Sequence, residues 1–120
     1  MSKKILIIED DTFLQGLAAN KLGDAGFEVT TASDGDEAMT ELAKGKFNCI
    51  LLDLMLPDIS GFDILKNIRE SSKSVPVIVF SNLSEDNDIK HATDLGATDY
   101  LVKSNFTLEE LVEKIEKTLS

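Results

Sequence analysis

A chain of 120 residues with 42% apolar and 28% charged residues is long enough for one folded domain with its own core. Its net charge of -10, from 22 acidic and 12 basic side chains, disfavours nucleic acid and anionic membranes as direct partners. A single cysteine, Cys49, excludes an internal disulfide and fits a reducing compartment. The four apolar residues after Met1–Lys4 are too few for a signal peptide or a membrane span, so we expect a cytoplasmic protein of one domain, residues 1–120.

Five short runs of residues predict five β-strands. Three runs are apolar without a break, which is typical of strands buried on both faces of a parallel sheet: Ile5–Ile8, Cys49–Leu52 and Val77–Phe80. The other two runs are Phe27–Thr31 and Thr98–Val102.

A helix is predicted after each strand from the spacing of apolar residues and from start signals. The expected starts are the capping boxes Thr12-x-x-Gln15 and Thr107-x-x-Glu110, the pattern Ser33-x-x-Asp36, and the residues Ser60 and Ser84. The helix of residues 84–94 has the thinnest apolar stripe, so it should be the least firmly held.

Alternating strands and helices predict an α/β fold, a doubly wound five-stranded parallel sheet with five helices on its two faces. The carboxyl ends of all five strands then lie at one edge. The residues expected there are Glu9, Asp10, Asp11, Asp53, Ser81 and Lys103. Clustered acids require a cation, and oxygen ligands suit Mg²⁺. A metal, a hydroxyl and an ammonium beside a carboxylate are suited to moving a phosphoryl group onto Asp53.

These motifs resemble those of bacterial response regulator receiver domains of the single-domain chemotaxis type. The matching segments cover nearly the whole chain: Lys4–Asp11, Leu51–Gly61, Ser81 and Gly96–Lys103. The resemblance implies a flavodoxin-like sheet of strand order 2-1-3-4-5. It also implies a phosphorylation-dependent signalling switch that uses Mg²⁺ and takes its phosphoryl group from a sensor histidine kinase or a phosphotransfer protein. Such a switch assists its own phosphorylation and dephosphorylation and is not otherwise an enzyme.

Carried over by position, the resemblance gives each site residue a role. It implies Asp53 as phosphoacceptor, Asp10, Asp53 and the Met55 carbonyl as direct metal ligands, Glu9 as a ligand through water, Lys103 and Ser81 as partners of the phosphoryl oxygens, and Ser81 and Tyr100 as switch residues. Asp11 matches no ligand position, so we expect it to cap the first helix. The output surface would be the fourth helix, fifth strand and fifth helix, binding a downstream protein that the sequence does not name.

The sequence departs from the family pattern at two places. Asn82 stands where a small residue usually follows the hydroxyl residue, and its bulk is expected to crowd the approach to Asp53. Lys103-Ser104-Asn105-Phe106 replaces a shorter Lys-Pro-Phe pattern. We expect a trans Lys103–Ser104 bond because a cis bond without proline costs about 3–4 kcal/mol. The extra length should be absorbed by Ser104 and Asn105, whose short polar side chains tolerate unusual backbone conformations, with Lys103 still pointing at Asp53.

Three other functions place different demands on these residues. A hydrolase with an aspartyl-phosphate intermediate needs a second acid two residues after the nucleophile, where this chain has Met55. A flavin-binding module is disfavoured because Glu9, Asp10 and Asp11 would repel a phosphate. A phosphorylation-independent interaction module on the same fold stays open because of Asn82. The sequence shows no output domain, and it leaves open whether this is a free-standing regulator or part of a longer protein.

Overall fold

The computed structural model describes residues 2–120, which contain one five-stranded sheet. The strands are β1 (Lys4–Ile8), β2 (Glu28–Ala32), β3 (Cys49–Leu52), β4 (Val77–Ser81) and β5 (Asp99–Val102). Every neighbouring pair is parallel, and the order across the sheet is β2-β1-β3-β4-β5. The predicted fold class and strand order are therefore confirmed.

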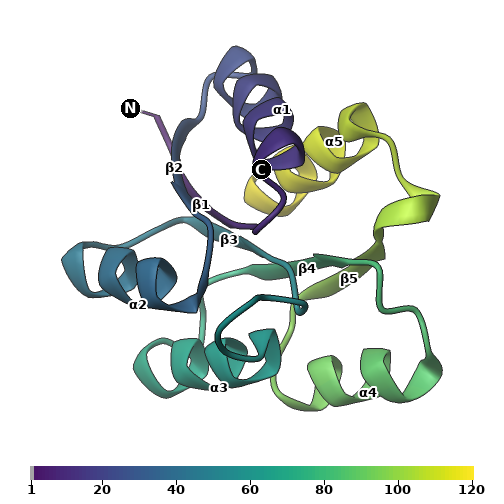
Figure 1. The fold of residues 1–120 in the computed structure, drawn as a ribbon. Coiled ribbons are helices and arrows are strands. Elements are labelled where there is room, and N and C mark those ends of the chain that lie inside the picture. Colours follow the sequence, from purple (N-terminus) through teal and green to yellow (C-terminus); the bar gives the residue numbers. More distant parts are fainter. Residues whose placement is uncertain (1) are drawn as a thin grey trace.

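Helices follow the strands in strict alternation, and all of them begin at the carboxyl edge of the sheet (Figure 1). They are α1 (Thr12–Asp24), α2 (Gly35–Lys44), α3 (Gly61–Ser71), α4 (Asp86–Asp94) and α5 (Leu108–Leu119), with a single 3₁₀ turn η1 (Lys103–Asn105) before α5. None of the helices described in residues 2–120 is both long and apolar enough to cross a membrane.

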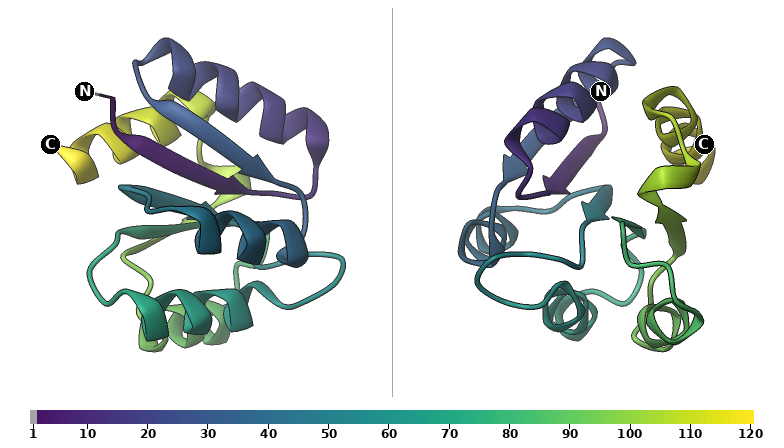
Figure 2. Two further views of the ribbon diagram at one scale, coloured as in Figure 1. Left: turned by 90° about the vertical axis from the view of Figure 1, so that its left-hand side faces the viewer. Right: turned by 45° about the vertical axis from the view of Figure 1, so that its right-hand side comes forward.

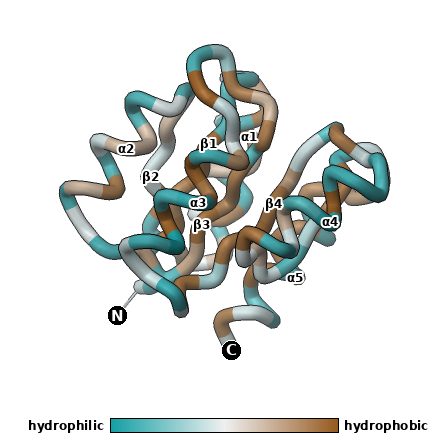
Figure 3. Tube along the Cα trace, turned by 90° about the horizontal axis from the view of Figure 1, so that it is seen from below, coloured by the Kyte–Doolittle hydropathy of each residue, from teal (hydrophilic) through white to brown (hydrophobic). Residues whose placement is uncertain are grey.

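Two apolar clusters fill the two sides of the sheet. Helices α1 and α5 cover one face and α2, α3 and α4 cover the other (Figure 2). Along β1, Ile5 and Ile7 pack toward α1 and α5, whereas Leu6 and Ile8 pack toward α2 and α3. Strands β1, β3 and β4 are accordingly the most apolar part of the chain (Figure 3). Because the central strands are buried on both faces, their polar neighbours in sequence are confined to the strand ends.

The start of α1 differs from one of the sequence predictions. Asp11 is the N-cap, and its Oδ1 accepts hydrogen bonds from the backbone N–H groups of Phe13 and Leu14, both at 3.1 Å. The predicted role of Asp11 is thus confirmed. The capping box Thr12-x-x-Gln15 was wrong because Asp11 caps the helix one residue earlier, which releases Gln15 for other contacts.

The remaining helix starts follow the same capping chemistry with small shifts. Asp34, one residue after the predicted Ser33, caps α2, whereas Ser60 and the capping box at Thr107 stand as predicted. Helix α4 begins at Asp86, two residues later than Ser84, and its N-cap Glu85 makes no side-chain cap hydrogen bond. Its single buried residue is Ala92, so α4 is held by less packing than its neighbours, as the sequence predicted.

The turn after β5 takes up its extra residue without a cis bond. The Lys103–Ser104 bond is trans, and residues Lys103–Asn105 form the 3₁₀ turn η1. Neither Ser104 nor Asn105 has a positive φ, so the unusual conformation expected for them was wrong. A tightened turn with an i to i+3 bond absorbs the extra residue within ordinary backbone geometry.

Cys49 opens the central strand β3 and is completely buried. Burial raises the pKa of its thiol to about 12, because the apolar surroundings disfavour the thiolate. The side chain therefore acts as a small apolar residue of the core.

Arg69 of α3 joins the entrance of β4 to the loop that follows α4. Its guanidinium donates hydrogen bonds to the carbonyl oxygens of Gly96 at 2.9 Å and of Val75 at 2.7 Å. Gly96 has φ +103°, a backbone conformation that would be strained for any residue with a side chain. The carboxyl end of α4 is thus fixed by Arg69, whereas its amino end lacks a side-chain cap.

We predict that Arg69→Met lowers the free energy of unfolding by about 2 kcal/mol, because it strands partly buried carbonyl acceptors while keeping most of the aliphatic stem. Urea unfolding would measure the loss. Lys66→Met, on an exposed position of the same helix, is the control and should change stability by less than about 0.5 kcal/mol. Equal losses in the two variants would contradict the anchoring role.

Candidate functional site

The carboxyl edge of the sheet gathers most of the residues that the sequence singled out. Glu9 and Asp10 follow β1, Asp53 follows β3, Ser81 ends β4 and Lys103 follows β5. The registers Leu52–Val79 and Ser81–Val102 place Asp53, Ser81 and Lys103 at nearly the same level. Glu9 and Asp53 are each only 4% exposed, whereas Asp10 lies exposed beside them.

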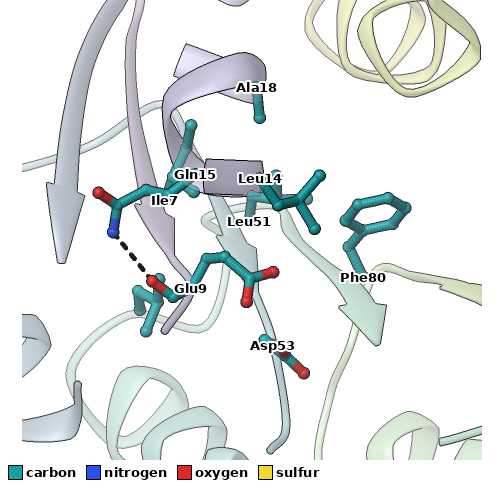
Figure 4. A pocket seen from close by; sticks show the side chains of 9 residues that line it. Ile7, Glu9, Leu14, Gln15, Ala18, Leu51, Asp53 and Phe80 are labelled. Atoms are coloured by element: carbon teal, nitrogen blue, oxygen red, sulfur yellow. Dashed lines mark hydrogen bonds between the residues drawn. The ribbon is translucent and has the colours of Figure 1, made fainter. Parts of the chain in front are cut away.

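The ammonium of Lys103 lies between two carboxylates. Its Nζ is 2.6 Å from Glu9 Oε1 and 2.8 Å from Asp53 Oδ2, and its side chain is 13% exposed. Figure 4 shows the two carboxylates at the ends of adjacent strands, next to the ring of Phe80. The prediction that Lys103 points at Asp53 is confirmed.

Burial and pairing oppose each other in this cluster. Burial is the main cause that raises the pKa of Glu9 to about 7, against the lowering effect of the hydrogen bond from Lys103. Burial alone would lower the pKa of Lys103, but its bonds to Asp53 and Glu9 outweigh that effect and raise it. Lys103 therefore stays charged, and Glu9 is a weaker acid than an exposed glutamate.

The acids of this cluster form a donor set that fits Mg²⁺. Glu9, Asp10 and Asp53 each offer a carboxylate oxygen, and these oxygens lie within 4.8 Å of one another. Three hard oxygen donors, one of them exposed, suit a cation that keeps part of its water shell. The backbone N–H of Met55 donates to Asp53 Oδ1 at 3.0 Å, which brings the Met55 main chain beside the same carboxylate.

Ser81 and Tyr100 are connected through one residue of the loop before α4. The Ser81 hydroxyl accepts a hydrogen bond from the Leu83 N–H at 3.3 Å, and the Leu83 carbonyl accepts one from the Tyr100 hydroxyl at 2.6 Å. Burial raises the pKa of Tyr100 to about 12, so the phenol is neutral and able to donate. Asn82, which lies between Ser81 and Leu83 in the chain, is exposed.

Two polar residues that the sequence analysis did not assign to the site lie around it. Gln15 donates to the Glu9 carbonyl at 2.9 Å (Figure 4), and Asp58 accepts from the first residues of α2. The sequence held a weak signal for Gln15, which stands between the apolar Leu14 and Ala18 of the predicted helix. The structure shows its amide half-buried, where it requires partners. Asp58 looked like a turn residue, and nothing local pointed to a contact 22 residues away.

Comparison with known families matches residues 5–116 to the response regulator receiver domain. The chain belongs to this family. Among curated relatives of the receiver domain, the transcriptional regulatory protein CiaR of Streptococcus pneumoniae is 40% identical over 116 residues, which are 97% of this chain and 51% of that protein. The transcriptional regulatory protein CrdR of Helicobacter pylori is 37% identical over 98% of this chain and 55% of its own length. The chain spans about half the length of the curated relatives it matches.

Solved receiver domains have the same architecture. A CheY-like receiver domain protein from Methanospirillum hungatei superposes with a TM-score of 0.94 at 27% identity, covering 99% of this chain and 94% of that chain. The response regulator TrrA of Thermotoga maritima, in a complex with Mg²⁺ and beryllofluoride, superposes with a TM-score of 0.85 at 31% identity, covering 96% and 97%. The receiver domains of two-component systems act as signalling switches, and this chain has their fold and sequence signature.

We predict that Lys103→Met lowers the free energy of unfolding in metal-free buffer by about 3–5 kcal/mol, because it leaves Glu9 and Asp53 buried without a counter-ion. Urea unfolding at pH 8 would measure the loss, and Mg²⁺ should restore part of it by replacing the missing positive charge. The control is Lys114→Met, which removes a more exposed ion pair with Asp99 and should cost less than about 1 kcal/mol. A loss in Lys103→Met no larger than in the control would contradict this balance of charges.

Proposed function

We propose that Asp53 of this receiver domain accepts a phosphoryl group from a phosphohistidine of a sensor kinase or phosphotransfer protein. The observation that carries the proposal is the placement of one ammonium, Lys103, between the buried carboxylates of Glu9 and Asp53, with Asp10 exposed beside them. Such a group of acids repels an incoming phosphoryl group unless cations neutralise it. The Lys103 ammonium supplies one positive charge, and the carboxylates could hold a metal ion that supplies more.

Mg²⁺ is the metal we propose for this site. Asp10, Asp53 and the Met55 carbonyl would bind it directly, and Glu9 would bind through a water molecule. When bound, the ion neutralises charge on the phosphoryl oxygens and on Asp53 as they approach each other. The donor set of three carboxylates supports this assignment, as does the Mg²⁺ complex of the related TrrA.

The transfer needs little beyond positioning and charge. An oxygen of Asp53 forms a bond to phosphorus while the bond from phosphorus to the histidine nitrogen of the donor breaks, and that nitrogen takes up a proton. Lys103 then exchanges Asp53 Oδ2 for a phosphoryl oxygen. The Ser81 hydroxyl donates to another phosphoryl oxygen, in the same way as backbone and side-chain donors stabilise transferred charge elsewhere. These same groups would assist the later loss of the phosphoryl group to water.

We predict that acetyl phosphate, a small phosphoryl donor, adds the mass of one phosphoryl group to the protein in the presence of Mg²⁺ and not in its absence. Asp53→Asn should remove the added mass, because an amide is not a competent acceptor. Intact-mass spectrometry is the measurement, and Asp63→Asn, an exposed acid of α3, is the matched control. Labelling that survives in Asp53→Asn would refute the acceptor assignment.

The output surface follows from the link between Ser81 and Tyr100. When the Ser81 hydroxyl turns toward a phosphoryl oxygen, it leaves the Leu83 N–H, and the loop that also holds Tyr100 is released. The amino end of α4 follows this loop and lacks a side-chain cap, so it is the part that moves most readily. We infer that α4, β5 and α5 form the surface that binds a downstream protein.

The partner of this surface is a protein rather than nucleic acid, because the net charge is -10. The named relatives are transcriptional regulators about twice as long as this chain. In a protein of that kind the DNA contacts would come from the part that this chain does not match.

We predict that beryllofluoride with Mg²⁺, a mimic of the phosphoryl group, changes amide hydrogen exchange in residues 82–90 and around Tyr100. The reason is that these segments lose the Leu83 contacts described above. Hydrogen exchange read by mass spectrometry or NMR would test this. Changes restricted to α1 and α2 would place the output surface elsewhere.

A further inference from the structure

The turn between β2 and α2, residues 33–36, is contacted from two sides: by Gln15 of the helix that follows the Asp10 loop, and by Asp58 of the loop that follows Asp53. We propose that Gln15 and Asp58 are positioning residues that hold these two loops against this turn, so that the site is preorganised for Mg²⁺. The proposal rests on the proposed function of the acidic site. It adds two residues that touch neither the metal nor the phosphoryl group.

Gln15 ties the ends of β1 and β2 together. Its Nε2 is 2.9 Å from the Glu9 carbonyl oxygen, 3.1 Å from Ser33 Oγ and 3.2 Å from the Ala32 carbonyl oxygen. The Glu9 carbonyl belongs to the peptide bond that leads into Asp10. Fixing the plane of this peptide bond fixes the position of the Asp10 Cα and so limits where the Asp10 side chain can reach.

Asp58 ties the loop after β3 to the first turn of α2. Its Oδ1 accepts from the Gly35 N–H at 2.7 Å and its Oδ2 accepts from the Asp36 N–H at 3.0 Å. A carboxylate at a helix amino terminus also interacts favourably with the helix dipole. These bonds, with the Gly35 contact as the main cause, lower the pKa of Asp58.

The loop that Asp58 holds is closely packed. A Cβ at Gly35 would lie 2.8 Å from Ile59 Cγ2, and one at Gly61 would lie 2.6 Å from the Asp53 carbonyl oxygen. The loop also closes on itself through the Gly61 N–H and the Leu54 carbonyl at 3.0 Å. Because the loop has little free space at Gly35 and Gly61, a shift of Asp58 would also move the main chain of Asp53.

Both arms meet at the same short turn. Gln15 contacts Ser33, Asp58 contacts Gly35 and Asp36, and Glu37 closes the turn by accepting the Ser33 N–H at 2.8 Å. Gln15 and Asp58 are 43 positions apart in the chain, and each reaches the acids through a different loop. The turn is thus the common support of the ligands from β1 and from β3.

This support matters because Mg²⁺ demands near-octahedral geometry and short bonds to oxygen. Residues that orient metal ligands without touching the metal typically change metal affinity by about 10–100-fold when they are removed. A contribution to stability alone would lower the free energy of unfolding and leave the affinity of the folded protein unchanged. The two roles can therefore be separated by experiment.

The experiment compares Mg²⁺ dissociation constants of Gln15→Met and Asp58→Asn with wild type, measured by NMR titration without any phosphoryl donor. Each variant should bind Mg²⁺ about tenfold more weakly. The matched controls, Asn20→Met on an exposed position of α1 and Asp63→Asn with the same loss of charge, should bind within about twofold of wild type, since neither holds either loop. Urea unfolding run in parallel shows that each variant is folded, and Gln15→Ala is a second variant should Gln15→Met not fold.

A second readout needs no metal. In metal-free protein the amide resonance of Asp10 should shift in Gln15→Met and that of Met55 should shift in Asp58→Asn, whereas the controls leave both in place. At saturating Mg²⁺, the rate of labelling by acetyl phosphate should return close to that of wild type, because the chemical groups are intact.

The double variant tests the shared support. Its affinity loss should be smaller than the product of the two single losses, since either change already frees the turn. Wild-type affinity in the single variants, or a double variant whose loss equals that product, would overturn the inference while leaving the proposed function intact. A wild-type protein that neither binds Mg²⁺ nor is labelled by acetyl phosphate would overturn the proposed function and this inference with it.

Discussion

The ion pairs that Lys103 makes with Glu9 and Asp53 set the electrostatic balance of the whole carboxyl edge. Two carboxylates are buried there, and a buried charge without a partner is costly. The single ammonium of Lys103 compensates only part of the cost of burying the two negative charges. The pKa of Glu9 is raised because burial outweighs its hydrogen bond from Lys103. The edge is therefore short of positive charge by construction. This shortage favours a divalent cation at the edge, and under the proposed function that cation would offset the repulsion between the acids and an incoming phosphoryl group.

The sheet supplies the geometry for this balance. In a parallel sheet every strand delivers its next residue to the same edge, so residues far apart in the chain meet without any special loop. Asp53 and Lys103 are 50 positions apart and are joined by a hydrogen bond of 2.8 Å. The loops then need only hold still, and the close packing around Gly61 restricts the one that follows Asp53.

The strand ends were predictable because buried parallel strands leave an unmistakable apolar pattern, and the residue after each pattern must reach the edge. Glu9 and Asp53 were placed in this way, whereas Lys103 was placed by the mixed run Thr98–Val102 that precedes it. The contacts of Gln15 were missed because a nearby threonine imitated a capping box, and the actual cap, Asp11, stands one residue earlier. Asp58 was missed for a deeper reason. Its partners belong to α2, and only the tertiary arrangement brings α2 within reach. Similarly, the 3₁₀ turn at Ser104 could be anticipated as a trans connection, but its backbone form depends on where α5 docks.

The burial of Cys49 has a consequence for how the protein withstands chemical stress. The thiolate is the form that attacks oxidants and alkylating agents, and a thiol with a pKa of about 12 at the first position of the central strand forms almost none at neutral pH. Oxidants and alkylating agents can therefore reach this sulfur only in molecules whose sheet has opened. The rate at which Cys49 is modified in native buffer therefore measures how often the central strand opens.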